Sequence, residues 1–328
     1  MLTVHPSASV MRFTSRYLVR RPAVDRVASQ THRYFALFVA AVLITFVAAP
    51  LVSVYAEVHA SSPSANYYRI FTFVGSLVAM LALLVAIGVA ITGRRLGILW
   101  TARNTYSLSR LQVTLWSLLV LAALAAVVSC RARGLFIAQG PLGVDNALNL
   151  EIPQSLLALM GISVTSAAAV PAILSMKAQA SAPTGAQLNA ASARLGGDVQ
   201  ASGGVLVRPA NCPPLVRDLF QGDDISKAGT VDFSKVQQAV ITLILWVAYL
   251  GMLCLLFWTG QSLADAAHPG ATNLPKPSST FVFLLGISHA GYLAYKAAPV
   301  PSSPTTGTVP STTPVSATLP RPQPPTLQ

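Results

Sequence analysis

The side chain with the clearest potential for chemistry in this sequence is His289, which lies in a long apolar stretch near the C-terminus. Histidine changes its charge near neutral pH, so at this position it could relay a proton or act as a gate. It could also be a neutral histidine that is hydrogen-bonded to a neighbouring helix. A proton path normally needs a chain of polar groups, and Tyr292 and Tyr295 are the polar residues that follow closely. We therefore favour the structural role for His289.

Two short motifs of small residues occur in apolar surroundings, Gly161-Ile162-Ser163 and Gly286-Ile287-Ser288. Glycine lets two helix backbones approach closely, and small residues spaced four apart form packing faces in membrane helices. A helix-packing seam is therefore the favoured interpretation of both motifs. The alternative is that Ser163 and Ser288 line a narrow polar path or site between helices. The candidate packing or pore-lining residues are Gly161, Ser163, Gly286, Ser288 and His289.

Two glutamines open apolar segments in a common context, Ser109-Arg110-Leu111-Gln112 and Ser234-Lys235-Val236-Gln237. Gln112 and Gln237 could donate hydrogen bonds to carbonyl groups of another helix, or they could be solvated among the lipid headgroups. The serines that begin the two motifs fit helix N-caps, and Asp232 is another capping candidate. Both motifs are explained without a ligand, so the two glutamines are expected to be interfacial residues.

The two kinds of motif recur at one interval, because Ser109 and Ser234 are 125 residues apart and so are Gly161 and Gly286. This shared spacing predicts an internal duplication, in which residues 104–177 and 233–298 each form a hairpin of two membrane helices. A hairpin crosses the membrane twice, so both copies have the same orientation and form a parallel repeat. We expect a pseudo-two-fold axis along the membrane normal, with the second helices of the two hairpins in contact near it.

The elements that must position these residues are transmembrane helices. The 328 residues are 53% hydrophobic and only 10% charged, whereas soluble domains average about 25% charged residues. A bilayer core takes about 20 apolar residues of helix, and six stretches meet this length, at 34–55, 70–92, 111–129, 155–175, 237–259 and 279–297. Continuous apolar runs favour helices over a β-barrel. The sequence therefore predicts an all-α membrane protein with about six transmembrane helices, of which the first two form a separate hairpin at 34–92.

The distribution of basic residues predicts the orientation of these helices. Of the 22 Lys and Arg residues, 18 lie on the side that carries both termini and four lie on the opposite side. Basic residues concentrate in cytoplasmic loops, so both termini are expected in the cytoplasm of a cell whose inner membrane holds the protein. The net charge of +12 follows from this asymmetry and from attraction to anionic lipid, so nucleic-acid binding is not expected.

Three segments are expected outside the bilayer. Residues 1–33 are basic and fit a short helix on anionic lipid, with an organelle transit peptide as the alternative. Residues 178–232 are expected to form a cytoplasmic linker loop that is flexible at first and contains a short helix after Pro213 and Pro214. Residues 299–328 are rich in Pro and Thr and are expected to be disordered.

Charged residues near the membrane are given structural roles. The aspartates of the linker do not follow the spacing of a calcium loop, so we expect solvated turn residues at Asp218, Asp223, Asp224 and Asp232. Lys296, at the end of the last predicted helix, is expected to extend to the aqueous surface.

Neither an enzyme nor a cofactor is predicted. The three cysteines, Cys130, Cys212 and Cys254, are far apart and form no metal-binding pair. The sequence contains no hydrolase, metalloprotease or nucleotide-binding motif in a plausible context. No catalytic, cofactor-binding or metal-binding residue is therefore assigned.

Three motifs resemble those of a group of uncharacterised bacterial multi-pass membrane proteins. They are the motif at Ser109 that opens a Trp-bearing helix, IPQSLLALMGIS from Ile152, and LLGISHAGYLAYKA from Leu284. The resemblance covers residues 104–298. It implies a bacterial envelope setting and implies no activity.

Two functions remain open from the sequence. The duplicated hairpin, with small polar residues at matched depth, favours a channel or transporter subunit in the lipid bilayer that assembles as a homo-oligomer. The polar loop and the two unusual ends favour a membrane anchor or scaffold that recruits a cytoplasmic protein partner.

Overall fold

The structure is a computed structural model that describes residues 21–56, 58–59, 61–136, 150, 152–179, 182–209, 212–260 and 274–298. The predictions for residues 1–20 and for the tail at 299–328 lie outside this part of the chain. Five of the described helices are long and apolar enough to cross a membrane, namely Val27–Val52, Pro63–Thr92, Leu108–Ala132, Gln154–Ala178 and Phe233–Thr259. The prediction of a mainly helical membrane protein is confirmed.

The first of these helices contains a π-helical turn. Helix α1 (Arg21–Leu43) continues through η2 (Ile44–Ala48) into α2 (Ala49–Tyr55). Pro50 has no amide hydrogen, and its ring crowds the carbonyl four residues earlier, which accounts for the wider turn just before it. The turn packs closely on α3 (Pro63–Thr92), because a Cβ atom added to Gly75 would lie 2.1 Å from the Thr45 hydroxyl oxygen.

Helix α3 begins at Pro63 rather than near residue 70, so Arg69 lies inside the helix. The Arg69 side chain is buried, and its Nε atom donates to the Phe257 carbonyl oxygen at 2.9 Å. Its two terminal nitrogens donate to the carbonyl oxygens of Leu135 and Trp258. A positive charge beside the last carbonyls of a helix is favourable, so Arg69 ties α3 to the end of α7 (Phe233–Thr259).

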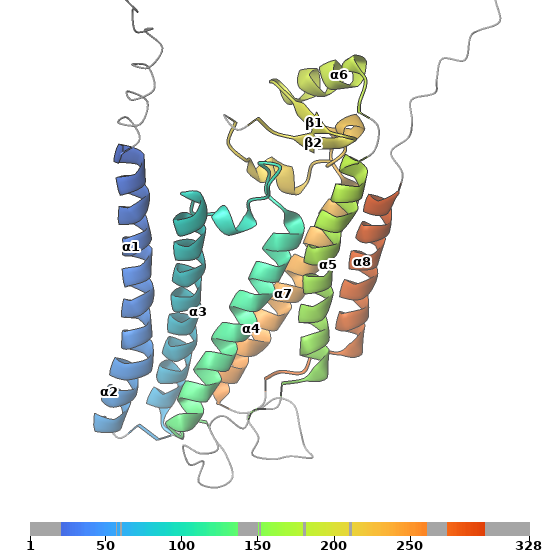
Figure 1. The fold of residues 1–328 in the computed structure, drawn as a ribbon. Coiled ribbons are helices and arrows are strands. Elements are labelled where there is room, and N and C mark those ends of the chain that lie inside the picture. The colour runs from blue at the N-terminus through green and yellow to red at the C-terminus, as the bar shows by residue number, and fades with distance from the viewer. Residues whose placement is uncertain are drawn as a thin grey trace, which may run out of the picture. The chain divides into compact units, whose positions relative to one another are not determined.

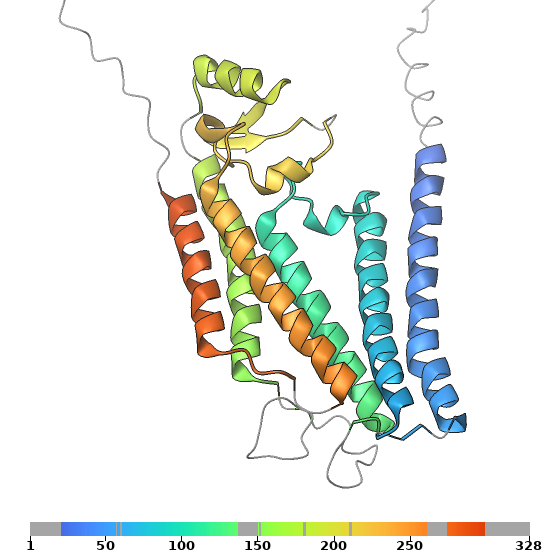
Figure 2. The same ribbon diagram turned by 180° about the vertical axis from the view of Figure 1, so that it is seen from behind.

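Two helical hairpins are stacked as layers (Figures 1 and 2). One consists of α4 (Leu108–Ala132) and α5 (Gln154–Ala178), and the other of α7 and α8 (Ser279–Ala297). Helix α4 packs against α5 and α7, and α8 also packs against α5 and α7. The expected contact between the second helices of the hairpins, α5 and α8, is therefore present, and the first helices, α4 and α7, are neighbours as well.

Helices α4 and α7 form the centre of the fold. They are joined by the Trp116 and Tyr249 rings, whose centroids lie 6.1 Å apart, and by a 3.0 Å hydrogen bond from Trp246 Nε1 to the Leu115 carbonyl oxygen. Helix α3 packs against both, and α1 covers α3.

The buried faces of α4 and α7 do not fall on the residues that the repeated sequence motifs align. Buried positions on α4 include Ser109, Gln112 and Trp116, and those on α7 include residues 235, 238 and 242. These faces correspond at an interval of 126 residues, one more than the motif interval. One residue turns an α-helix by about 100°, so α7 is rotated about its own axis relative to the position that the duplicated sequence predicts.

Helix α8 is shorter and more polar than the five apolar helices. Its 19 residues span roughly 28 Å, close to the ~30 Å bilayer core. Its buried face carries Ser288, His289, Tyr292 and Lys296 together with Leu285.

The segment between α5 and α7 is folded, so the prediction that its first half, through Gly204, is a flexible linker is wrong for the described residues of that half. It contains α6 (Gly185–Leu195), strands β1 (Gln200–Ser202) and β2 (Val205–Val207), and the short helices η5 (Val216–Leu219) and η6 (Ile225–Lys227). A small cluster of Ala191, Leu206, Ile225 and Ala228 forms its core. We call residues 182–209 and 212–232 the cap. The expected short helix after Pro214 is present as η5.

The loop before α4 completes this end of the bundle. It contains η3 (Gly97–Leu99) and a bridge between Trp100 and Tyr106. Asn104 has a positive φ of 58° and donates to the carbonyl oxygens of Pro209 and Cys212. The loop is therefore bonded to the cap.

The Arg69 contact can be tested at Gly260, which has a φ of +66° and whose added Cβ would lie 2.5 Å from the Arg69 guanidinium carbon. Gly134 is a matched control, because its φ is +64° and its added Cβ would meet no atom within 4 Å. Both Ala variants carry the backbone strain of a left-handed residue, about 1 kcal/mol. We expect Gly260→Ala to lower the free energy of unfolding by a further ~1.5 kcal/mol or more, because a charged hydrogen bond is displaced. Unfolding in detergent micelles measures both, and equal losses would contradict the Arg69 contact.

Candidate functional site

One carboxylate, that of Asp223 in the cap, is mostly buried, with 13% of its side chain exposed, and pairs with cations from three other segments. Its Oδ1 atom lies 3.0 Å from Nη2 of Arg103 in the loop before α4. Its Oδ2 atom lies 2.9 Å from Nζ of Lys235 in the first turn of α7, and it also pairs with Lys296 near the end of α8. A carboxylate offers about four lone-pair sites, so all three cations can be accommodated.

Both lysines of this cluster are buried. The side chains of Lys235 and Lys296 are only 3% and 6% exposed. Lys235 Nζ also donates to the Gln221 carbonyl oxygen at 2.6 Å, and Lys296 Nζ donates to the Tyr292 hydroxyl oxygen at 2.9 Å. The expectation that Lys296 extends to the aqueous surface is wrong, because the cap brings a carboxylate to the end of α8.

Two further aspartates of the cap, Asp224 and Asp218, also form ion pairs rather than being solvated. Asp224 pairs with Lys177 at the end of α5, with 3.0 Å between Nζ and Oδ2. Asp218 pairs with Arg208 at 2.8 Å. The Asp218–Arg208 pair lies within the cap, whereas the Asp224–Lys177 pair and the Asp223 cluster attach the cap to the ends of α5, α7 and α8.

The helix caps also differ in part from those predicted from the serine motifs. Ser107, not Ser109, is the N-cap of α4, and its hydroxyl accepts from the Arg110 amide. Asp232, the alternative candidate, is the N-cap of α7 and accepts from the amides of Ser234 and Lys235.

The charges around Asp223 determine its protonation. Burial disfavours a charged carboxylate and by itself would raise the pKa of Asp223, but the charges of Lys235, Lys296 and Arg103 outweigh it and hold the pKa well below its ordinary value. Asp223 is therefore ionised throughout the physiological range.

A polar band crosses the interface between α5 and α8. The two helices are in contact where an added Cβ at Gly286 would lie 3.7 Å from Ile162 Cδ1, and again where Tyr292 packs in one cluster with Val170 and Leu174. Both helices run in the same direction, so the residues between these contacts lie at the same level.

The buried polar residues at that level are Ser163 and Ser166 on α5 and Ser288 and His289 on α8. Ser163 donates to the Leu159 carbonyl oxygen of its own helix. The hydroxyls of Ser166 and Ser288 and both ring nitrogens of His289 have no hydrogen-bond partner among the described residues. We call these four residues the seam.

The two Gly-Ile-Ser motifs have different surroundings. Gly286 is half-buried against Ile162, as the prediction of a packing seam requires. Gly161 is exposed, and an added Cβ would meet nothing within 4 Å, so Gly161 packs against no other described helix of this chain. Ser163 and Ser288 are both buried.

The two glutamines that were predicted to be interfacial, Gln112 and Gln237, also differ in their surroundings. Gln112 is buried, and its amide nitrogen donates to the Thr242 hydroxyl oxygen at 2.8 Å. Its carbonyl oxygen accepts from Gln238 Nε2 at 3.0 Å. Gln237 is exposed, so the second glutamine of the α4–α7 contact is its neighbour. The spacing of Lys235, Gln238 and Thr242 follows one helix face and could have identified Gln238 from the sequence.

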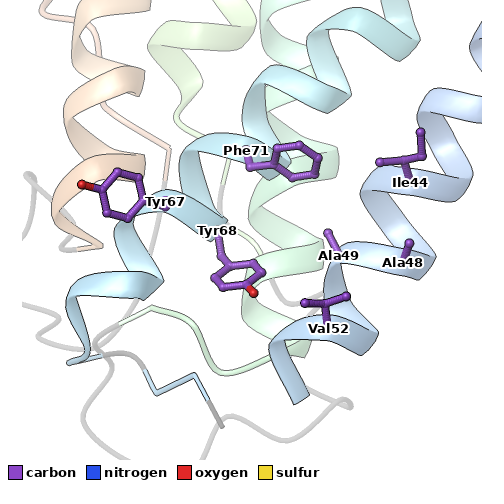
Figure 3. Close-up of a pocket in the computed structure, with 7 residues that line it drawn as sticks. All are labelled: Ile44, Ala48, Ala49, Val52, Tyr67, Tyr68 and Phe71. Atoms are coloured by element: carbon purple, nitrogen blue, oxygen red, sulfur yellow. The ribbon is translucent and has the colours of Figure 1, made fainter. Parts of the chain in front are cut away.

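A separate pocket of about 400 Å³ lies between the η2–α2 segment and α3. Figure 3 shows its lining, with Ile44, Ala48, Ala49 and Val52 on one side and Tyr67, Tyr68 and Phe71 on the other. Apart from the two tyrosine hydroxyls this lining is apolar, so the pocket offers no group suited to catalysis or to binding a cation.

Comparison with known proteins gives no relative from which a role for these residues could be transferred. No family model, no curated protein and no solved structure matches the chain.

The Asp223 cluster gives a prediction for stability. In Asp223→Asn three cations lose their shared charge partner, and removal of one member of a buried ion pair typically costs about 3–5 kcal/mol. We expect a loss of this size in the free energy of unfolding, measured in detergent micelles. Asp198→Asn is the matched control, because Asp198 is an exposed aspartate of the same cap, and it should cost less than about 0.5 kcal/mol. Similar losses in the two variants would contradict a central role for Asp223.

The pH dependence of this stabilisation gives a second prediction. The pKa of Asp223 is lowered in the folded protein, so its contribution is complete above the unfolded-state pKa of about 3.9 and is lost as the pH falls through the lower folded-state pKa. The difference in unfolding free energy between wild type and Asp223→Asn should therefore be constant from about pH 5 to 8 and shrink only below about pH 4. A difference that already shrinks between pH 7 and 5 would mean that burial outweighs the three cations.

Proposed function

We propose that the protein is a channel or transporter subunit that passes a small polar solute or protons along the seam between α5 and α8. The observation that supports this proposal is the set of buried polar atoms without a partner on Ser166, Ser288 and His289. A buried polar atom that lacks a hydrogen bond costs about 1–3 kcal/mol. Water or a polar solute in the seam would offset this cost, and buried water commonly satisfies such groups.

The polar face of α8 continues from the seam to the cap. His289, Tyr292 and Lys296 follow one another at helical spacing on the buried face, and Lys296 bonds to Tyr292 and pairs with Asp223. This sequence of groups supports a functional role for His289 more strongly than the sequence alone did, because a proton path needs a chain of groups. The cap ion pairs lie at the end of that line and are suited to control access to it.

The proposal includes α8 as a sixth membrane crossing. Its length suits the bilayer core, and its polar face is directed into the bundle, where polar residues of membrane helices are normally found. Six crossings put both termini on one side of the membrane, and the excess of basic residues on that side supports a cytoplasmic location at a cell inner membrane.

An internal duplication of the hairpins is a further part of the proposal. The N-caps of α4 and α7 are Ser107 and Asp232, and the N-cap positions of α5 and α8 are Pro153 and Ser278. Both pairs are 125 residues apart, the interval of the sequence motifs. Four helix starts at one interval support two copies of one hairpin that later diverged in rotation and burial.

A membrane scaffold is the second candidate function. It is favoured by exposed apolar side chains on the cap, where Leu215, Val216 and Phe220 are 39%, 61% and 37% exposed. Such residues on a folded cap are suited to contact with a protein partner.

Flux through proteoliposomes tests the proposed function. Gly286→Leu places a bulky side chain against Ile162 beside the seam, and we expect it to lower proton or small-solute flux at least tenfold while the protein still inserts. Gly291→Leu is the matched control, because Gly291 is an exposed residue of the same helix, and its flux should stay within about twofold of wild type.

The result that would overturn the channel proposal is equal flux for wild type, Gly286→Leu and protein-free vesicles. Homo-oligomeric protein with seam-dependent flux supports the channel proposal. Absence of flux together with a stoichiometric second polypeptide after gentle purification would favour the scaffold.

A further inference from the structure

A cavity of about 260 Å³ lies where the loop before α4 meets the cap end of α5. Its polar wall contains Arg103, Arg110, Thr101 and Ser107. Arg103 donates to Asp223 through Nη2, and a guanidinium group has five N–H donors, so donors remain beyond that bond. Arg110 is exposed, donates to the Trp100 carbonyl oxygen and makes no ion pair with any described carboxylate. The cavity therefore has a positive wall with donors that can serve an anion.

The opposite wall of the cavity is apolar and belongs to α5. It is formed by Val170, Pro171 and Leu174, with the Ser175 hydroxyl beside them. Pro171 and Ser175 are exposed on the outer surface of α5, so the cavity opens toward the surroundings of that helix. Since α5 is one of the helices able to cross a membrane, its outer surface near the membrane boundary faces lipid.

We propose that this cavity binds the phosphate-bearing headgroup of an anionic phospholipid. Arginine side chains recognise phosphate through paired N–H donors, and basic pockets beside membrane helices bind anionic headgroups. The volume lies below the roughly 300–1,000 Å³ of pockets for drug-sized ligands, so it suits a headgroup rather than a nucleotide or a cofactor. The acyl chains would lie along the apolar outer face of α5.

The position of the cavity connects such a lipid to the Asp223 cluster. Arg103 belongs both to the cavity wall and to the ion pairs of Asp223. A bound phosphate would therefore share a cation with the group that holds the cap in place. This inference rests on the cavity alone and does not depend on flux through the seam.

Binding is measured on the full-length protein in mild detergent, by native mass spectrometry and by the shift of the unfolding temperature. The probes are phosphatidylglycerol, phosphatidylcholine and inorganic phosphate. We expect phosphatidylglycerol to bind and stabilise, phosphatidylcholine to bind at least tenfold more weakly, and millimolar phosphate to leave lipid binding unchanged.

Arg110→Gln should weaken binding of phosphatidylglycerol about fivefold, because the phosphate loses the hydrogen bonds of one of the two arginines that line the cavity. Arg95→Gln is the matched control, because Arg95 is an exposed arginine of the same loop that does not line the cavity. It removes the same charge and should change affinity by less than twofold. Ser175→Phe keeps every charge but fills the cavity, and it should abolish the preference for the anionic lipid.

Three results would overturn the proposal. Equal effects of Arg110→Gln and Arg95→Gln would show that the lipid is attracted by the general surface charge and not by this cavity. Unchanged binding in Ser175→Phe would place the lipid elsewhere. Competition by inorganic phosphate would identify a site for a soluble anion instead of a lipid.

Discussion

The ion pairs of the mostly buried Asp223 carboxylate are the interactions on which the cap end of the structure depends. A lone carboxylate in this position would be expensive to bury, and so would Lys235 or Lys296. Together with Arg103 they form a cluster in which each charge offsets the burial of another. Because these four residues come from four separate segments, the ion pairs fix the cap, the loop before α4 and the ends of α7 and α8 at the same time.

The opposite end of α7 is held by a different electrostatic contact. Arg69 satisfies the last carbonyl groups of α7 and a carbonyl just after α4, where helices otherwise leave acceptors without donors. The two contacts use charge only at the ends of the helices. The middle of the bundle is held by apolar packing, and the Gln112–Gln238 pair joins α4 and α7 near the cap. Within the seam, polar atoms of Ser166, Ser288 and His289 have no hydrogen-bond partner among the described residues.

Sequence periodicity and hydropathy predicted the long helices because length and apolar character are local properties. The boundary at residue 70 was wrong because Pro63 can begin a helix while polar residues such as Asn66 and Arg69 follow it. From the sequence alone, Arg69 was assigned to a loop. Its burial depends on partners on α7 that are almost 190 positions away, so the local sequence does not reveal it.

The candidate site was predicted only in part, for similar reasons. Ser163, Ser288, His289 and Gln112 are buried as polar residues in apolar helices should be. Gln237 and Gly161 are exposed because the surroundings of each helix, which are set by tertiary packing, differ between the two hairpins. The ion pairs of Asp223 and Asp224 could not be predicted, because an aspartate in a polar segment has the same local sequence whether it is solvated or paired across the fold.

Hydrogen–deuterium exchange of the cap in the purified protein tests most directly whether the ion pairs hold it as a folded unit. The amides of Leu206, Ile225 and Asp232 donate to backbone carbonyls of the cap at 2.8, 2.9 and 2.8 Å. If the cap is a folded unit, these amides should exchange at least a hundredfold more slowly than an unstructured chain. Exchange at the unstructured rate across residues 200–232 would show a flexible linker and would contradict the central role of Asp223.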